Sequence, residues 1–281
     1  MAVTAHPVVR RVRAPIQGFG DADGTLMSAG LAYLAIFAVV SGLLLLISVL
    51  ILAGDSPEAR DAAVSWLIAR VPPLEALATQ IVEGLADGAR VGSIVGLIAF
   101  TWGLSGFYLG LHDALDRLFP AQRRRNRIIA RIQGIVAILL LVVAIAAVVA
   151  LGSLIAAIDA FRALAGLGLG TFTEPVLTVL AAIGVLLVVY RWLPSDPPSV
   201  REAAPSAIVA GVIIGFLTAL FGLIAPLLVG SLAGLGVITS VFVALIWFSW
   251  VFRVLLYGAA EACVRRDEAR GLPLPGEDGT G

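Results

Sequence analysis

Long runs of uncharged, mostly apolar residues alternate with short charged segments along this chain of 281 residues. A helix that crosses about 30 Å of hydrocarbon needs roughly 20 consecutive apolar residues. The pattern therefore predicts an all-α, polytopic helical membrane bundle. The charge-poor stretches that predict its spans are about 26–53, 91–111, 132–158, 175–192 and the long segment 203–252.

The segment 203–252 determines the number of spans. A single helix of this length would extend about 75 Å, more than twice the thickness of the hydrocarbon layer. The glycine cluster between Gly230 and Gly236 disfavours continued helix. We therefore predict two helices here, at about 205–229 and 237–260, and six transmembrane helices in all.

The composition agrees with a membrane domain over residues 25–265. Hydrophobic residues make up 60% of the chain and charged residues 14%, whereas soluble domains have about 45–50% and 25%. The formal net charge is zero, so no overall field attracts nucleic acid. Cys263 is the single cysteine, which excludes an intramolecular disulfide.

Arginine supplies all the basic residues and indicates the orientation. If the loops alternate across six spans, fourteen arginines lie on the side of the termini, four lie on the opposite side, and Arg253 lies within the sixth span. Because arginine is enriched in cytoplasmic loops, both termini are predicted to be cytoplasmic.

The terminal segments follow from this orientation. Residues 1–24 are expected to form a cytoplasmic N-terminal segment. Residues 266–281, with Pro273 and Pro275, are expected to form a disordered cytoplasmic tail.

The outer loop between spans one and two predicts an amphipathic helical hairpin over residues 56–88. Ser56-Pro57-Glu58 has the residue types of a helix start, and Pro72-Pro73 ends that helix and begins another. Such a hairpin could be a static cap on the bundle or a lid over a cavity between spans, and the sequence leaves both open.

Arg253 is the most distinctive candidate site residue. A charge at membrane depth costs about 2.5–3.5 kcal/mol even on insertion scales, so it normally faces protein or water. Tyr257 and Glu261 follow at intervals of four residues on the same helical face. This stripe could contact a lipid headgroup or line a translocation path. Alternatively, Arg253 extends to the interface, pairs with Glu261 or pairs with another helix.

A second cluster of polar residues lies at the cytoplasmic interface. His112, Asp113, Asp116 and Arg117 follow the second span, and Arg191 follows the fourth. We interpret them mainly as a solvated helix end with intrahelical pairs such as Asp113 with Arg117. A metal site would need more ligands than these, and the only other histidine is His6 in the N-terminal segment. No cofactor, nucleotide or zinc-enzyme motif is present, so no enzymatic activity is expected.

Glycine pairs with GxxxG spacing predict close helix packing. They are Gly92–Gly96, Gly106–Gly110 and Gly211–Gly215.

Four separated motifs occur along the chain. They are Ser28-Ala29-Gly30-Leu31-Ala32-Tyr33, Trp102 with Ala114-Leu115-Asp116-Arg117, Leu193-Pro194 with Pro205-Ser206-Ala207, and Tyr257-Gly258-Ala259-Ala260-Glu261. In this order and spacing, they resemble the motifs of the YihY/BrkB family of envelope-integrity proteins. The similarity covers about residues 25–265. Two departures are Ser206, where the family usually has glycine, and Glu261, which comes one residue late.

The resemblance implies a six-span inner-membrane protein linked to envelope integrity, whose members have been suggested to move lipids or other amphiphiles. Membrane lipids are then the expected partners, with envelope proteins or a second copy of the chain as further partners. The alternative is a scaffolding protein that acts through envelope-assembly partners without transport. The family's older ribonuclease label does not suit this sequence, because two isolated histidines cannot supply the clustered ligands of a metal-dependent nuclease.

Overall fold

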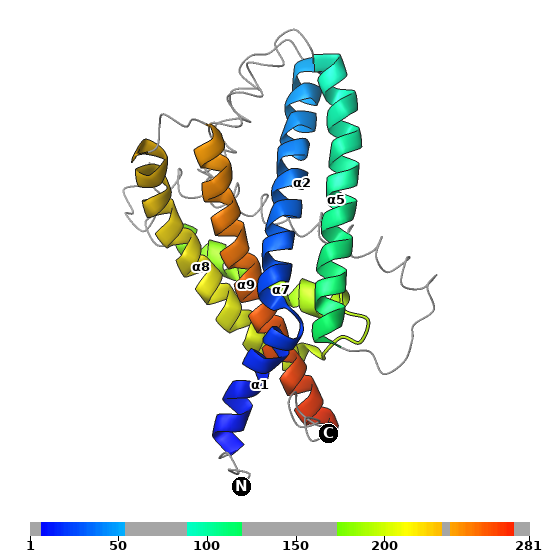
Figure 1. Ribbon diagram of the computed structural model, residues 1–281, viewed down its shortest axis with the longest axis vertical. Coiled ribbons are helices and arrows are strands. Elements are labelled where there is room, and N and C mark those ends of the chain that lie inside the picture. The colour runs from blue at the N-terminus through cyan, green and yellow to red at the C-terminus, as the bar shows by residue number, and fades with distance from the viewer. Residues whose placement is uncertain (1–6, 54–88, 120–172, 232–236, 273–281) are drawn as a thin grey trace, which may run out of the picture. The chain divides into compact units, whose positions relative to one another are not determined.

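The computed structural model describes residues 7–53, 89–119, 173–231 and 237–272, and among these residues the regular secondary structure is all helix, without a strand. Figure 1 shows the helices in chain order. They are α1 (Pro7–Asp21), α2 (Gly24–Ala53), α5 (Ala89–Leu118), α7 (Thr173–Trp192), α8 (Val200–Ser231) and α9 (Val237–Arg270). The predicted third span at 132–158, the outer hairpin at 56–88 and most of the break at 230–236 lie outside the described residues.

Five of the six predicted spans fall on helices of the structure. Helices α2, α5, α8 and α9 contain segments that are long and apolar enough to cross a membrane, whereas α7 has a shorter apolar segment, Thr178–Trp192. Large apolar side chains on these helices are exposed, among them Trp102 at 76% and Leu223 at 73%. Exposed apolar surface of this extent would be unfavourable in water and is typical of helices that face lipid.

The prediction that a disordered tail begins at residue 266 is wrong for its first residues, because α9 continues to Arg270. Two contacts with α1, a helix that the apolar pattern did not predict, explain this extension. Ala14 of α1 packs against Val264, and Arg11 pairs with Glu268 at 3.1 Å. The tertiary contacts thus stabilise a polar helix end that has no apolar run of its own.

The chain forms two compact units, and α2, α5, α8 and α9 contribute residues to both. Unit one comprises residues 1–25, 112–217 and 253–281, and unit two comprises residues 26–111 and 218–252.

In unit two, α2 and α5 lie side by side (Figure 1). A Cβ atom at Gly96 would lie 2.9 Å from the backbone nitrogen of Leu45, and one at Gly103 would lie 3.0 Å from the Cα of Ala38. Glycine therefore permits the close approach of these two backbones.

In unit one, α7 and α8 pack in the same manner. A Cβ atom at Gly211 would lie 3.0 Å from the backbone nitrogen of Ile183, and one at Gly215 would contact Val179. The predicted GxxxG packing is therefore confirmed for Gly211–Gly215, and the pair Gly106–Gly110 contacts Leu34 in unit two.

Candidate functional site

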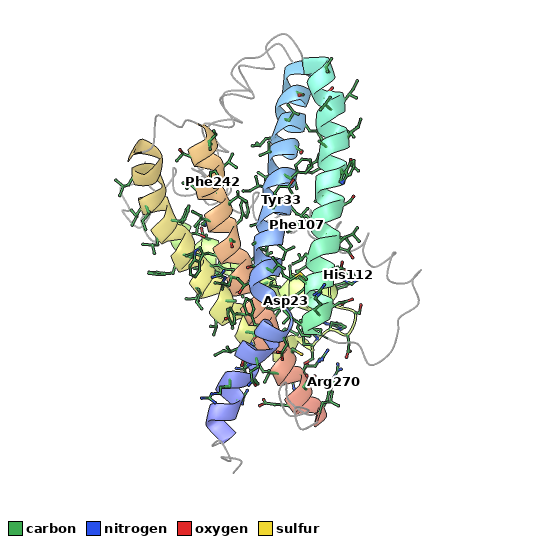
Figure 2. All side chains as sticks on the ribbon, viewed as in Figure 1. Asp23, Tyr33, Phe107, His112, Phe242 and Arg270 are labelled. Atoms are coloured by element: carbon green, nitrogen blue, oxygen red, sulfur yellow. The ribbon has the colours of Figure 1, made fainter. Side chains whose placement is uncertain are left out.

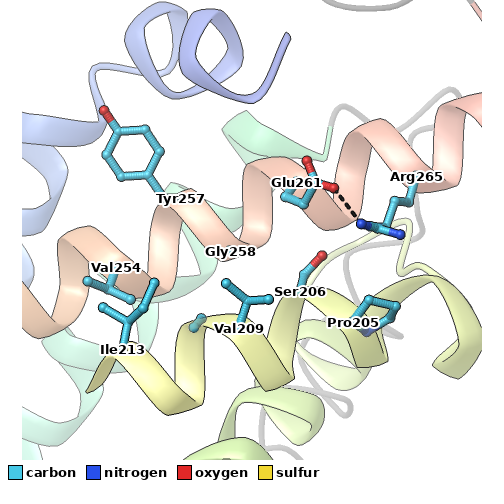
Figure 3. A pocket seen from close by; sticks show the side chains of 10 residues that line it. Pro205, Ser206, Val209, Ile213, Val254, Tyr257, Gly258, Glu261 and Arg265 are labelled. Atoms are coloured by element: carbon cyan, nitrogen blue, oxygen red, sulfur yellow. Dashed lines mark ion pairs between the residues drawn. The ribbon is translucent and has the colours of Figure 1, made fainter. Parts of the chain in front are cut away.

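A pocket of about 370 Å³ lies between α8 and α9 in unit one (Figure 3). We call it the α8–α9 pocket. Its walls come from the first half of α8, between Pro205 and Ile213, and from α9 between Val254 and Arg265.

Close helix packing at Gly258 fixes the relative positions of the two walls of the pocket. Gly258 lies against the hydroxyl of Tyr190 and against Ala210, where a Cβ atom would come within 3.0 Å of the Ala210 methyl carbon. The Tyr190 hydroxyl, fully buried, donates a hydrogen bond of 2.7 Å to the carbonyl of Leu255. Helices α7, α8 and α9 are thereby held together at Gly258 and Ala210, two of the residues that line the pocket.

One end of the pocket is polar. Arg265 and Glu261 form an ion pair of 2.9 Å between Nη2 and Oε1, one turn apart on α9. The Ser206 hydroxyl lies at the same end, on α8 (Figure 3). Ser206 is only 3% exposed, and within the described part of the chain neither its Oγ nor the buried Nε of Arg265 has a hydrogen-bond partner. Buried polar atoms are normally satisfied, so these two atoms are the groups in the pocket to which a bound polar molecule would supply hydrogen bonds.

The other end of the pocket is apolar. Ile213 of α8 lies beside Val254 of α9 there (Figure 3), and Val209 and Ala210 of α8 also line the pocket. The pocket thus has a charged end and an aliphatic end, and this arrangement matches a molecule with a polar head and an apolar chain.

The predicted stripe of Arg253, Tyr257 and Glu261 is brought only partly into this pocket. Tyr257 and Glu261 line it, whereas Arg253 is not among the lining residues, and the ion-pair partner of Glu261 is Arg265. The Tyr257 ring also stacks on Phe19 of α1, with 3.8 Å between ring centroids. The sequence prediction missed Arg265 as a site residue, although the acid-first spacing of four residues from Glu261 was a signal for the pair.

The second predicted cluster joins the end of α5 to the segment that links α7 and α8. His112 Nδ1 lies 2.9 Å from the carbonyl oxygen of Leu193, and its Nε2 lies 3.6 Å from Asp116 (Figure 2 labels His112). Asp116 accepts two hydrogen bonds from Ser195, one from the backbone N–H at 2.8 Å and one from the hydroxyl at 2.7 Å. This part of the cluster therefore makes tertiary contacts that the sequence did not predict.

The other members of that cluster lie at the surface. Asp113 and Arg191 are exposed. Arg117 was expected to pair with Asp113, but the ion pair that the structure gives it is with Asp23, at 3.9 Å. Among the described residues, no group of three or more His, Cys, Asp or Glu side chains is placed to hold a metal ion.

We predict that Asp116→Ala lowers the free energy of unfolding by about 1–2 kcal/mol, because two hydrogen bonds to a carboxylate are lost. Thermal unfolding in a mild detergent measures this change. Asp113→Ala is the matched control, since it removes an exposed acid from the same helix and should change stability by less than about 0.5 kcal/mol. Equal effects of the two substitutions would contradict a structural role for Asp116.

A buried ion-pair network lies near the C-terminal end of α9. Arg266 donates to Asp267 Oδ1 at 2.9 Å, to the Asp196 carbonyl at 2.8 Å and to Asp196 Oδ2 at 3.3 Å. Its guanidinium also lies over the Phe119 ring at 5.4 Å, and Arg270 donates to Asp196 at 2.6 Å. Figure 2 labels Arg270 at the end of α9. We call this network the Arg266 clasp; it connects α9 to the α7–α8 segment.

A family model described as the virulence factor BrkB matches residues 16–276. No curated protein and no solved structure matches the chain significantly. The family match covers most of the chain, and the helices within it are long, apolar and exposed. The chain is therefore an integral membrane protein that belongs to the BrkB family, also called YihY/BrkB.

Proposed function

We propose that this protein resides in the bacterial inner membrane, with six spans and both termini in the cytoplasm, and that it supports envelope integrity by moving a lipid or other amphiphile. The observation that supports the activity is the α8–α9 pocket, which combines an ion pair and a buried hydroxyl with an aliphatic wall. The proposed activity breaks no covalent bond.

Contacts among the arginine-rich segments support the orientation. Arg11, Arg117 and Arg266 belong to three segments far apart in sequence, yet all lie in unit one. There they pair with Glu268, Asp23 and Asp196, respectively. Segments that alternate with spans can meet only if they lie on one side of the membrane, and their arginine enrichment supports the cytoplasm as that side.

The size and polarity of the pocket support an amphiphile as the substrate. A polar headgroup that enters hydrocarbon without partners is strongly destabilised, so a protein site that supplies hydrogen-bond partners to the headgroup lowers the barrier to its movement. Ligand pockets typically measure about 300–1,000 Å³. At about 370 Å³, this pocket accommodates a headgroup and the beginning of a chain, while the rest of the chain would remain in lipid.

The test is movement of a fluorescent phospholipid between leaflets of liposomes that contain the purified protein. The wild-type protein should accelerate this movement over empty liposomes. Val209→Trp places a large side chain in the pocket and should slow the movement about tenfold, if overpacking raises the barrier by about 1.4 kcal/mol. Val212→Trp is the matched control, because Val212 is also an exposed valine of α8 but does not line the pocket.

Absence of acceleration across a panel of lipids with different headgroups would overturn the proposed movement. In that case, crosslinking that repeatedly recovers one envelope-assembly protein would support the scaffolding role. Equal slowing by both tryptophan substitutions would show that the α8–α9 pocket is not the path.

A further inference from the structure

We propose that the α8–α9 pocket selects a zwitterionic headgroup that has both a primary ammonium and a phosphate, as in phosphatidylethanolamine. This inference rests on the proposed function and names its substrate class. The ammonium would bind Glu261, and the phosphate would bind Arg265 and Ser206.

The charge of the pocket favours a headgroup without net charge. The charged side chains that line it are one carboxylate, on Glu261, and one guanidinium, on Arg265. A phosphate diester without a cation of its own would bind Arg265 and place its negative charge beside the Glu261 carboxylate. The two negative charges would then repel each other. A headgroup with its own cation removes this repulsion, because the ammonium replaces the guanidinium as the partner of Glu261.

The ion pair between Glu261 and Arg265 leaves most of their hydrogen-bond donors and acceptors unused, so a headgroup can bind to both side chains. The single contact between Nη2 and Oε1 uses one of the five N–H donors of Arg265 and one lone pair of the carboxylate. The Arg265 Nε and the Ser206 Oγ are buried and have no hydrogen-bond partner in the described part of the chain. A phosphate oxygen accepts from both a guanidinium N–H and a hydroxyl, so one phosphate could satisfy both atoms.

The same chemistry discriminates against two related headgroups. A quaternary ammonium, as in phosphatidylcholine, has no N–H to donate to Glu261 and occupies more of a small pocket. A glycerol headgroup, as in phosphatidylglycerol, supplies no cation, so its phosphate faces Glu261 without compensation. The aliphatic wall of Val209, Ile213 and Val254 then suits the first methylenes of an acyl chain, which free phosphoethanolamine lacks.

The experiment measures binding of short-chain phospholipids to the full-length protein in detergent. We expect phosphatidylethanolamine to bind at least about tenfold more tightly than phosphatidylglycerol, phosphatidylcholine or free phosphoethanolamine. Glu261→Gln should reduce the preference for phosphatidylethanolamine over phosphatidylglycerol about tenfold, whereas Arg265→Gln should weaken binding of both lipids. Ser206→Ala should weaken both to a smaller extent. Asp113→Asn, which removes an exposed carboxylate outside the pocket, should leave all four affinities unchanged.

Three results would overturn the inference. They are equal affinity for the three phospholipids, an unchanged preference in Glu261→Gln with an unchanged melting temperature, and binding of free phosphoethanolamine as tight as that of the lipid. If lipid movement in liposomes persists in any of these cases, the headgroup assignment fails but the proposed function stands. If phosphatidylethanolamine binds selectively but no lipid moves, the proposed function fails and the binding site stands.

Discussion

Arg266→Ala is expected to lower the free energy of unfolding by about 3–5 kcal/mol, the usual cost of removing one partner from a buried ion pair. The Arg266 side chain is only 3% exposed, and its guanidinium neutralises Asp267, which is itself buried. Alanine would remove the guanidinium donor from that carboxylate and from the Asp196 carbonyl. Because an uncompensated buried charge is costly, the end of α9 should separate from the α7–α8 segment before the rest of the protein unfolds.

Cys263 reports this local opening. It is the single cysteine of the chain, it is 4% exposed, and its sulfur lies 3.5 Å from Arg266 Nη2. In the wild-type protein, alkylation by a maleimide should be slow, and Arg266→Ala should accelerate it markedly at a temperature where the protein is still folded. The melting temperature in detergent gives the global measure of stability.

Arg270→Ala is the matched control for this experiment. Arg270 also pairs with Asp196, but its side chain is 40% exposed, so its removal should cost no more than about 1 kcal/mol and leave Cys263 protected. If Arg270→Ala destabilised the protein as strongly as Arg266→Ala, the stabilisation by the Arg266 clasp could not be attributed to the burial of Arg266.

Gly258→Ala is expected to destabilise the protein by about 2 kcal/mol, although alanine is the better helix former. The new methyl group would collide with the Tyr190 hydroxyl and crowd the Ala210 methyl carbon. Tyr190 would have to move, and its hydrogen bond to the Leu255 carbonyl would be lost. The overpacking thus outweighs the gain in helix propensity.

A double-mutant cycle with Tyr190→Phe identifies the cause. Phenylalanine lacks the hydroxyl oxygen, which is the atom nearest to the new methyl group, so Gly258→Ala should cost about 1 kcal/mol less in that background. Gly222→Ala in α8 is the control, because no atom lies within 4 Å of a Cβ there, and it should be neutral or slightly stabilising. Strict additivity of the two substitutions would contradict this contact. Thermal unfolding of the four proteins measures the cycle.

The location of the helices could be predicted from local sequence because a span must contain about 20 apolar residues wherever it packs. The predicted spans 26–53 and 175–192 correspond closely to α2 and α7, and the predicted start of the sixth span at residue 237 is the first residue of α9. Helix ends in polar segments could not be predicted in this way. The extension of α9 to Arg270 depends on Arg11, Ala14 and Asp196, which lie far away in sequence.

Only the part of the candidate site that depends on local helix geometry could be predicted from the sequence. Tyr257 and Glu261, which spacing by four residues places on one face of a helix, both line the α8–α9 pocket. Whether a neighbouring helix faces that stripe is a tertiary property. The pocket includes Arg265 and Ser206 and leaves out Arg253, since α8 approaches α9 where Gly258 meets Ala210.

The sequence by itself determined that this is a helical membrane protein of the BrkB family, because apolar length and the order of short motifs are local properties of the chain. Only the tertiary structure decided which polar residues act together. It joined Asp116 to Ser195 and Arg266 to Asp196, and it enclosed the Glu261–Arg265 pair beside an aliphatic wall. The physical reason is that a buried polar group is stable only with a partner, and in this fold the partner commonly belongs to another helix or loop.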